Sequence, residues 1–118
     1  MILGIGIDLV ELNRIKEIMT ERFIDRILSH DEKIAFNNIA ADNMKLSYLG
    51  SRFAAKEAIF KAISKGPGKT NYVEFSILNH ENGSPYVKTD FFKNKEIIHI
   101  SITHTDEHAI AYVMIEKL

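Results

Sequence analysis

The sequence predicts an α+β domain in which a mainly antiparallel sheet packs against one long helix and several shorter helices. Two observations carry this prediction. A helical pattern of apolar residues runs from about residue 45 to residue 65, where Gly66-Pro67-Gly68 would end it. From Tyr72 onward apolar residues recur at every second position, and Asn82-Gly83 is typical of the turn in a β-hairpin.

Length and composition predict a single domain, residues 1–118. The chain is 46 % hydrophobic and 26 % charged, as in ordinary globular proteins, and it contains no cysteine, which fits a reducing cytoplasm. The net charge of −1 argues against binding of nucleic acid through overall charge. The sequence has no apolar run of membrane-spanning length. We therefore expect a cytoplasmic protein that binds neither nucleic acid nor membrane.

The first strand, beginning at residue 2, alternates between aliphatic residues and residues without a large apolar side chain. One face carries Leu3, Ile5, Ile7 and Leu9, and the other carries Gly4, Gly6 and Asp8. The aliphatic face is expected to be packed. Glycine inside a strand marks a place that something approaches closely, which we interpret as clearance for a bulky ligand. Asp8 either caps the following turn or belongs to a site.

Three short helices are expected over residues 14–19, 23–28 and 29–40. Ser29 and Glu32 predict a capping box at the start of the third, and Asp42-Asn43 is expected to interrupt the helical pattern. After the long helix, strands are expected over residues 72–78, from Tyr86, over residues 98–102 and over residues 108–115. The last strand is apolar on both faces, so a neighbouring element or a second copy should cover it.

The long helix carries an acid in an unusual place. Glu57 lies at the centre of a stripe formed by Leu46, Leu49, Phe53, Phe60 and Ser64. Because burying a lone carboxylate is costly, Glu57 needs a partner. One alternative is an ion pair with Lys61, four residues further on. The other is a Mg²⁺ site shared with Asp8, since two carboxylates plus water and substrate phosphates commonly hold this ion.

Basic residues on the same helix suit a phosphate-bearing substrate. They are Arg52, Lys56, Lys61 and Lys65. We expect Arg52 and Lys61 to flank the Glu57 stripe, and Lys56 and Lys65 to be solvated. His104 ends a predicted strand and is expected to form hydrogen bonds at the rim of a site.

Five segments form a recognisable set in their order and spacing, and the match that rests on them covers nearly the whole chain. They are GIGIDLVELNRI (4–15), RFIDRIL (22–28), SRFAAKEAIFKA (51–62), NGSPYV (82–87) and HISITHT (99–105). Together they resemble the holo-acyl-carrier-protein synthases, the small bacterial 4′-phosphopantetheinyl transferases. The resemblance implies transfer of the phosphopantetheine arm of coenzyme A to a serine of apo acyl carrier protein, with release of 3′,5′-ADP, in support of fatty acid biosynthesis. A non-catalytic coenzyme A- or nucleotide-binding module and a structural oligomer-forming domain are the alternatives.

The resemblance also implies roles for individual residues. Asp8 and Glu57 match the acids that bind Mg²⁺, and Lys61 matches the lysine that contacts the phosphates and can protonate the leaving phosphate. These three are the expected catalytic residues, with either Asp8 or a metal-ordered water as the base for the serine hydroxyl. The positions implied for coenzyme A are Arg52, Lys61, Gly66, Gly83, Pro85 and His104. A glycine-threonine-glycine segment common in the family is replaced here by Ser64-Lys65-Gly66-Pro67-Gly68, which leaves coenzyme contacts from that loop open.

The implied partners are coenzyme A, an acidic apo acyl carrier protein and two further copies of the chain. Arg14, Arg22 and Arg26 lie beside apolar residues at near-helical spacing, as expected of a surface that docks an acidic helix. A solvated face is the alternative, because acidic residues interleave with the arginines. The resemblance further implies a homotrimer with coenzyme A bound between neighbouring subunits.

Overall fold

The computed structural model describes residues 1–64 and 70–118, and it confirms the α+β class. The elements, in chain order, are β1 (Ile2–Glu11), α1 (Leu12–Ile18), α2 (Glu21–Ile27), α3 (His30–Asn37), α4 (Asp42–Ile63), the 3₁₀ turn η1 (Tyr72–Glu74), β2 (Ser76–Asn79), β3 (Pro85–Lys88), β4 (Glu96–His104) and β5 (His108–Lys117).

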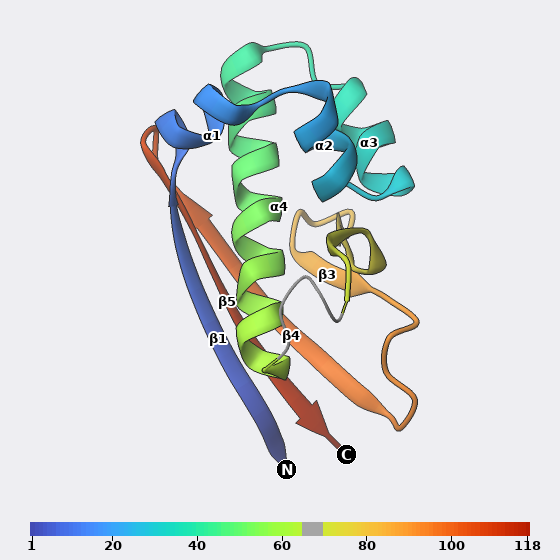
Figure 1. The fold of residues 1–118 in the computed structure, drawn as a ribbon. Coiled ribbons are helices and arrows are strands. Elements are labelled where there is room, and N and C mark those ends of the chain that lie inside the picture. Colours follow the sequence, from blue (N-terminus) through green and yellow to red (C-terminus); the bar gives the residue numbers. More distant parts are fainter. Residues whose placement is uncertain (65–69) are drawn as a thin grey trace.

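The strands form two antiparallel sheets. Strands β1, β5 and β4 make a three-stranded sheet in that order, and β2 pairs only with β3 within the described residues. Helix α4 lies across the three-stranded sheet, α1 to α3 gather toward one end, and the β2–β3 hairpin lies on the other side of α4 (Figure 1). The two termini meet, because the amino group of Met1 donates to the carbonyl of Lys117 at 2.9 Å.

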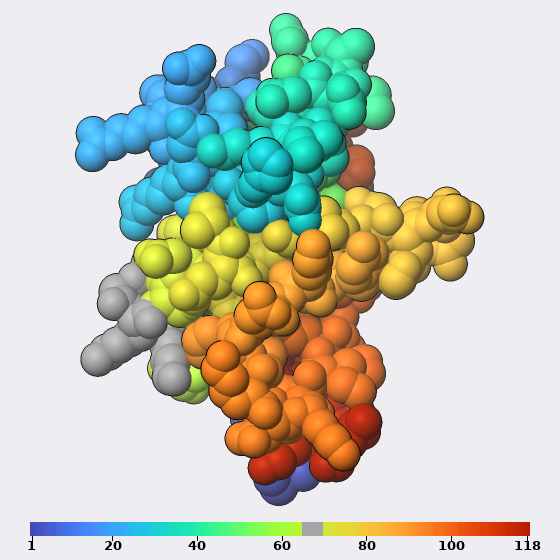
Figure 2. Space-filling view, turned by 90° about the vertical axis from the view of Figure 1, so that its right-hand side faces the viewer, coloured from blue at the N-terminus to red at the C-terminus, as the bar shows by residue number. Residues whose placement is uncertain are grey.

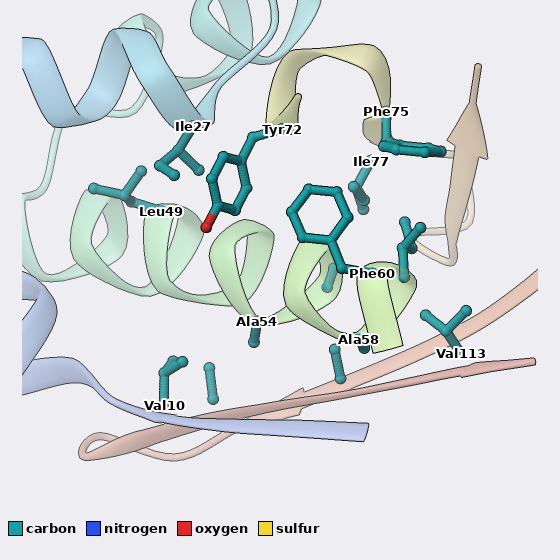
Figure 3. Packing of buried hydrophobic residues seen from close by; sticks show 14 of the residues in the cluster. Val10, Ile27, Leu49, Ala54, Ala58, Phe60, Tyr72, Phe75, Ile77 and Val113 are labelled. Atoms are coloured by element: carbon teal, nitrogen blue, oxygen red, sulfur yellow. The ribbon is translucent and has the colours of Figure 1, made fainter. Parts of the chain in front are cut away.

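Helix α4 is the centre of the core and is buried on most of its surface. Ala54 and Ala58 point from α4 toward the strands, whereas Tyr72 and Phe60 pack on its opposite side (Figure 3). The buried face of β5 completes the first of these layers with Ala109, Ala111, Val113 and Ile115. Small side chains on both surfaces let the helix and the sheet approach closely.

The glycines of β1 are where this approach is closest. A Cβ atom added to Gly4 or Gly6 would lie 1.9 Å from the carbonyl oxygen of Ala62 or Ala58, respectively. The backbone of α4 therefore fills the space that these glycines leave. Our interpretation of the glycine face as clearance for a bulky ligand was wrong, since the body that approaches is the protein's own helix. Asp8 follows on the same face of the strand.

The aliphatic face of β1 is turned away from the helix, so the expectation that it is packed was wrong for the single chain. Leu3, Ile5, Ile7 and Leu9 are between 45 and 60 % exposed. Tyr112 of β5, which pairs with Ile7 of β1, is 42 % exposed. The outer surface of the three-stranded sheet is therefore an exposed apolar row.

Several element boundaries follow from local hydrogen bonds. The predicted capping box is present, with Ser29 and Glu32 each bonded to the other's backbone amide. Asp42 begins α4 instead of interrupting it, because an acid is favoured in the first turn of a helix. Asn71 and Glu74 form a second capping box that starts the turn η1, so β2 begins only at Ser76. The predicted hairpin turn is confirmed at Gly83, whose φ is +91°.

A buried ion pair joins α3 to α4. Lys56, which we expected to be solvated, is fully buried and donates to Glu32 and to the carbonyl of Ile27. Glu32 also accepts from the backbone amides of Ser29 and Ile77, so its carboxylate connects α3, α4 and β2. Burial lowers the pKa of Lys56, and the charge of Glu32 opposes that shift.

Within the described residues, no helix has the length and apolar character needed to span a membrane.

Replacing Gly6 with alanine should lower the free energy of unfolding by about 3 kcal/mol, since the new methyl group meets helix backbone and not a movable side chain. Gly50→Ala is the matched control. There the added Cβ meets Leu12 Cδ2, a side-chain atom, and alanine gains about 1 kcal/mol of helix propensity. Urea unfolding of both variants measures the difference, and equal losses would contradict the close contact between β1 and α4.

Candidate active site

Asp8 and Lys61 join β1 to α4. The ammonium group of Lys61 donates to Asp8 Oδ1 at 3.2 Å and to the carbonyl of Ile7 at 2.9 Å. Lys61 therefore reaches across to the strand, in place of the ion pair with Glu57 that the helical spacing allowed. Asp8 does not cap the turn after β1, because Glu11 occupies the N-cap position of α1.

The charge of Glu57 also acts on Asp8. Burial raises the pKa of Asp8, the hydrogen bond and charge of Lys61 lower it, and the negative charge of Glu57 raises it again, so that the net shift is upward. The side chain of Asp8 is only 17 % exposed. Two carboxylates that repel one another in a partly buried place are stabilised by a cation between them.

Tyr72 supplies the second contact of Glu57. Its hydroxyl donates to Glu57 Oε1 at 2.6 Å, and the residue is only 7 % exposed. Burial and, next, the hydrogen bond to Glu57 raise the pKa of Tyr72 above its usual range, so the hydroxyl stays protonated and remains a donor. Tyr72 was not among the site residues expected from the sequence. It lies 15 residues beyond Glu57, and no spacing rule links the two positions.

Asp8 and Glu57 suit a Mg²⁺ ion better than they suit a metal ion that is held by protein ligands on all sides. Among the residues that the structure describes, no three histidines or acids come together as a potential metal cage. Asp8 and Glu57 instead offer two carboxylates. Mg²⁺ is commonly bound by one or two carboxylates, with water and substrate phosphates completing its octahedral shell.

A cavity of about 430 Å³ is lined by most of the residues implied for binding coenzyme A. Arg52, Gly83, Pro85 and His104 all line it, although they come from α4, the β2–β3 hairpin and the end of β4. The hairpin turn projects from the body of the molecule (gold in Figure 2). Two implied positions remain. Lys61, which is also an expected catalytic residue, does not line the described cavity, and Gly66 lies outside the described residues.

Arg52 is fixed in the wall of this cavity. Its guanidinium donates to the carbonyl of Ile77 at 3.2 Å and to Asn79 Oδ1, and it lies 4.0 Å above the ring of Tyr48. Asn79 in turn donates to the carbonyl of Gly83 at 2.8 Å. Burial lowers the pKa of Arg52 from its high ordinary value. The guanidinium thus ties α4 to the hairpin.

The cavity and the acids lie on different sides of α4. Arg52 and Glu57 are five residues apart, which separates them by about 140° around the helix. Arg52 points toward β2, whereas Lys61 points toward β1. The described lining of the cavity includes neither Asp8 nor Glu57.

The three arginines predicted for docking are all exposed. Arg14 lies on α1, whereas Arg22 and Arg26 lie on α2, because Thr20 caps a new helix after the break at Met19. The guanidinium of Arg26 lies 5.5 Å from the centre of the Tyr72 ring. The docking surface proposed from the sequence therefore borders the aromatic group that contacts Glu57.

Comparison with known proteins identifies the class to which this fold and site belong. Residues 4–113 match the 4′-phosphopantetheinyl transferase superfamily, and the chain is a member of that family. Within it, the chain is similar along its whole length to holo-[acyl-carrier-protein] synthases, as the sequence analysis predicted. The relative from Acholeplasma laidlawii is 47 % identical over 116 residues, covering 98 % of both chains. A relative from a Geobacillus strain is 47 % identical over 122 residues, covering 100 % of this chain and 99 % of its own.

Solved structures agree. A holo-(acyl-carrier-protein) synthase from Bacillus anthracis, in complex with CoA (3′,5′-ADP), superposes with a TM-score of 0.90 at 34 % identity and covers 100 % of this chain and 99 % of its own. A holo-[acyl-carrier-protein] synthase from Helicobacter pylori, in complex with coenzyme A, superposes with a TM-score of 0.80 at 27 % identity and covers 95 % of this chain and 99 % of its own.

Proposed function

We propose that this protein carries out the holo-[acyl-carrier-protein] synthase reaction with a Mg²⁺ ion held by Asp8 and Glu57. The reaction moves the 4′-phosphopantetheine arm of coenzyme A to a serine of apo acyl carrier protein and releases 3′,5′-ADP. The observation that supports the metal is the pair of partly buried acids, one from β1 and one from α4, beside the ammonium of Lys61. The expected setting is fatty acid biosynthesis in the cytoplasm.

The chemistry requires one bond to form and one to break. The serine oxygen bonds to the phosphorus that carries the pantetheine arm, and the bond from that phosphorus to the oxygen bridging to 3′,5′-ADP breaks. When bound, Mg²⁺ would neutralise charge on the pyrophosphate oxygens. The serine proton passes to Asp8 or to a metal-ordered water.

Lys61 is suited to the leaving group. An ammonium group has three N–H donors, and two of them are directed at Asp8 and at the carbonyl of Ile7. Its side chain is 56 % exposed, so within the described contacts the third donor faces solvent. It can bind a phosphate oxygen there and give a proton to the departing phosphate.

The cavity lined by Arg52 and His104 is proposed to hold the coenzyme. Arg52 is fixed by its bonds to Ile77 and Asn79, and its charge suits a phosphate group. Because this cavity and the two acids lie on different sides of α4, one coenzyme molecule would use the cavity of one subunit and the acids of its neighbour. This arrangement favours an oligomer with its sites between subunits.

The exposed face of β1 is the surface proposed to join the subunits. Four large aliphatic side chains lie exposed in a row there, and a contiguous apolar patch is typical of an interaction surface. We propose that further copies of this chain cover this face and that the assembly is a homotrimer. The number of copies follows the family resemblance given above.

The first test is transfer itself. Apo acyl carrier protein, coenzyme A and Mg²⁺ are mixed with the protein, and the carrier is weighed by mass spectrometry. We expect one phosphopantetheine increment with the wild type. Asp8→Asn and Glu57→Gln should each lower turnover by about a hundredfold or more, since the metal contributes several kcal/mol.

Asp90→Asn, which removes an exposed acid from the connection between β3 and β4, is the control and should keep full activity. Near-normal turnover in both site variants would rule out the metal assignment. A wild type that binds coenzyme A but never modifies the carrier would support the non-catalytic coenzyme A-binding module instead.

The docking surface predicts an effect on KM. Arg14→Ala should raise the KM for the carrier several-fold, leave kcat nearly unchanged and weaken the dependence of KM on salt, because a charge at the rim of the interface is lost. Lys93→Ala removes an exposed positive charge on the β3–β4 connection and serves as the control. Equal KM values for the two variants would count against docking at Arg14.

The oligomer is tested by placing a charge in the apolar row. Ile5→Glu should convert the trimer to monomers in light scattering coupled to size exclusion, with a parallel loss of activity if each site spans two subunits. Ile34→Glu provides a matched control, because Ile34 is an isoleucine on α3 that is exposed to a similar extent, 52 % against 60 % for Ile5. A trimer that survives Ile5→Glu and dissociates with Ile34→Glu would place the interface elsewhere.

A further inference from the structure

The side chain of Glu57 accepts a hydrogen bond from the hydroxyl of Tyr72. The hydroxyl donates to Glu57 Oε1 at 2.6 Å from the turn η1, an element separate from the strand that carries Asp8. Figure 3 shows the ring of Tyr72 beside Phe60, with the hydroxyl oxygen directed at α4. The reaction proposed above requires nothing of this group.

The ring is held independently of Glu57. It stacks on Phe53 at 5.9 Å between ring centres and meets Phe60 edge-on at 4.9 Å. The guanidinium of Arg26 covers it at 5.5 Å. The backbone of Tyr72 is fixed as well, because the capping box described above starts η1 directly before it. Packing therefore fixes the position of the hydroxyl without any contribution from Glu57.

A glutamate has three side-chain torsions, so a metal-binding carboxylate on a helix must be restrained to present its oxygens in one direction. A donor on one carboxylate oxygen supplies this restraint and leaves the other lone pairs for a cation. Groups that orient a metal ligand in this way typically change metal affinity about 10- to 100-fold when they are removed.

We propose that Tyr72 is a positioning residue, whose hydroxyl orients the Glu57 carboxylate for a divalent cation. The inference rests on the proposed function, because it assumes a cation at Asp8 and Glu57. It adds a third side chain to that site and connects the site to α2 through Arg26, which covers the same ring.

The test measures metal binding without turnover. Mn²⁺, which takes the same oxygen ligands as Mg²⁺ and is visible by electron paramagnetic resonance, is titrated into the full chain with and without coenzyme A, in the absence of carrier protein. Tyr72→Phe removes only the hydroxyl and keeps the ring. We expect the variant to bind Mn²⁺ about tenfold more weakly than the wild type, with an unchanged thermal unfolding midpoint for the metal-free protein.

Tyr86→Phe is the control, since it removes a tyrosine hydroxyl from β3 and keeps the stacked ring contact with His80. Its Mn²⁺ affinity should equal that of the wild type. Equal or tighter binding in Tyr72→Phe would overturn the proposal. Glu57→Gln should lose Mn²⁺ binding, and a wild type that binds no Mn²⁺ under either condition would overturn the metal site and this inference together.

A second measurement needs no variant and so does not depend on how the substitution folds. With tyrosine labelled at the ζ-carbon by ¹³C, Mg²⁺ is titrated into the wild type and each ring is followed by nuclear magnetic resonance. The Tyr72 signal should move with the midpoint of metal binding, while the Tyr86 signal stays in place. A Tyr72 signal that does not move while Mg²⁺ binds would show that the hydroxyl is not coupled to metal binding at Glu57, and it would overturn the proposal.

Discussion

The contact of β1 with the backbone of α4 is the constraint on which the rest of the structure depends. Only glycine at positions 4 and 6 lets the strand lie against the carbonyl groups of Ala58 and Ala62. Because side chains alternate along a strand, the next residue on that face, Asp8, is delivered to the helix surface beside Lys61 and Glu57. The separation between strand and helix thus determines how close Asp8 lies to Lys61 on the helix, and a larger residue at either glycine would move them apart.

The opposite side of α4 is organised by charge instead of close backbone contact. The carboxylate of Glu32 accepts from the amide of Ile77, and the guanidinium of Arg52 donates to the carbonyl of the same residue. Both polar groups of one β2 residue are therefore bonded to charged side chains from the helices. Breaking a buried ion pair such as Glu32–Lys56 leaves an unpaired charge, so this side of the molecule tolerates little change.

The sequence was sufficient for the fold class and for the family, and it drew attention to Asp8 and Glu57 as the proposed metal-binding acids. Apolar periodicity and turn residues determine helices and hairpins locally, and a carboxylate within an apolar stripe is visible at Glu57. The contacts of Lys56 and Tyr72 could not be predicted, because each depends on a partner brought near only by tertiary packing. The direction in which β1 faces was misjudged for a similar reason. Alternation reveals two faces, but not which of them meets a helix that can approach glycine.

The order of strands in the three-stranded sheet has a consequence for how the chain acquires its structure. The central strand, β5, follows both of its partners in the sequence, and β1 pairs with it across a separation such as that from Ile2 to Glu116. During synthesis, β1 emerges long before it has a partner. The helices can form early from local contacts, but the sheet has to wait for β5. In the interval, β1 is an apolar segment with an unpaired backbone, which is the kind of segment that chaperones shield.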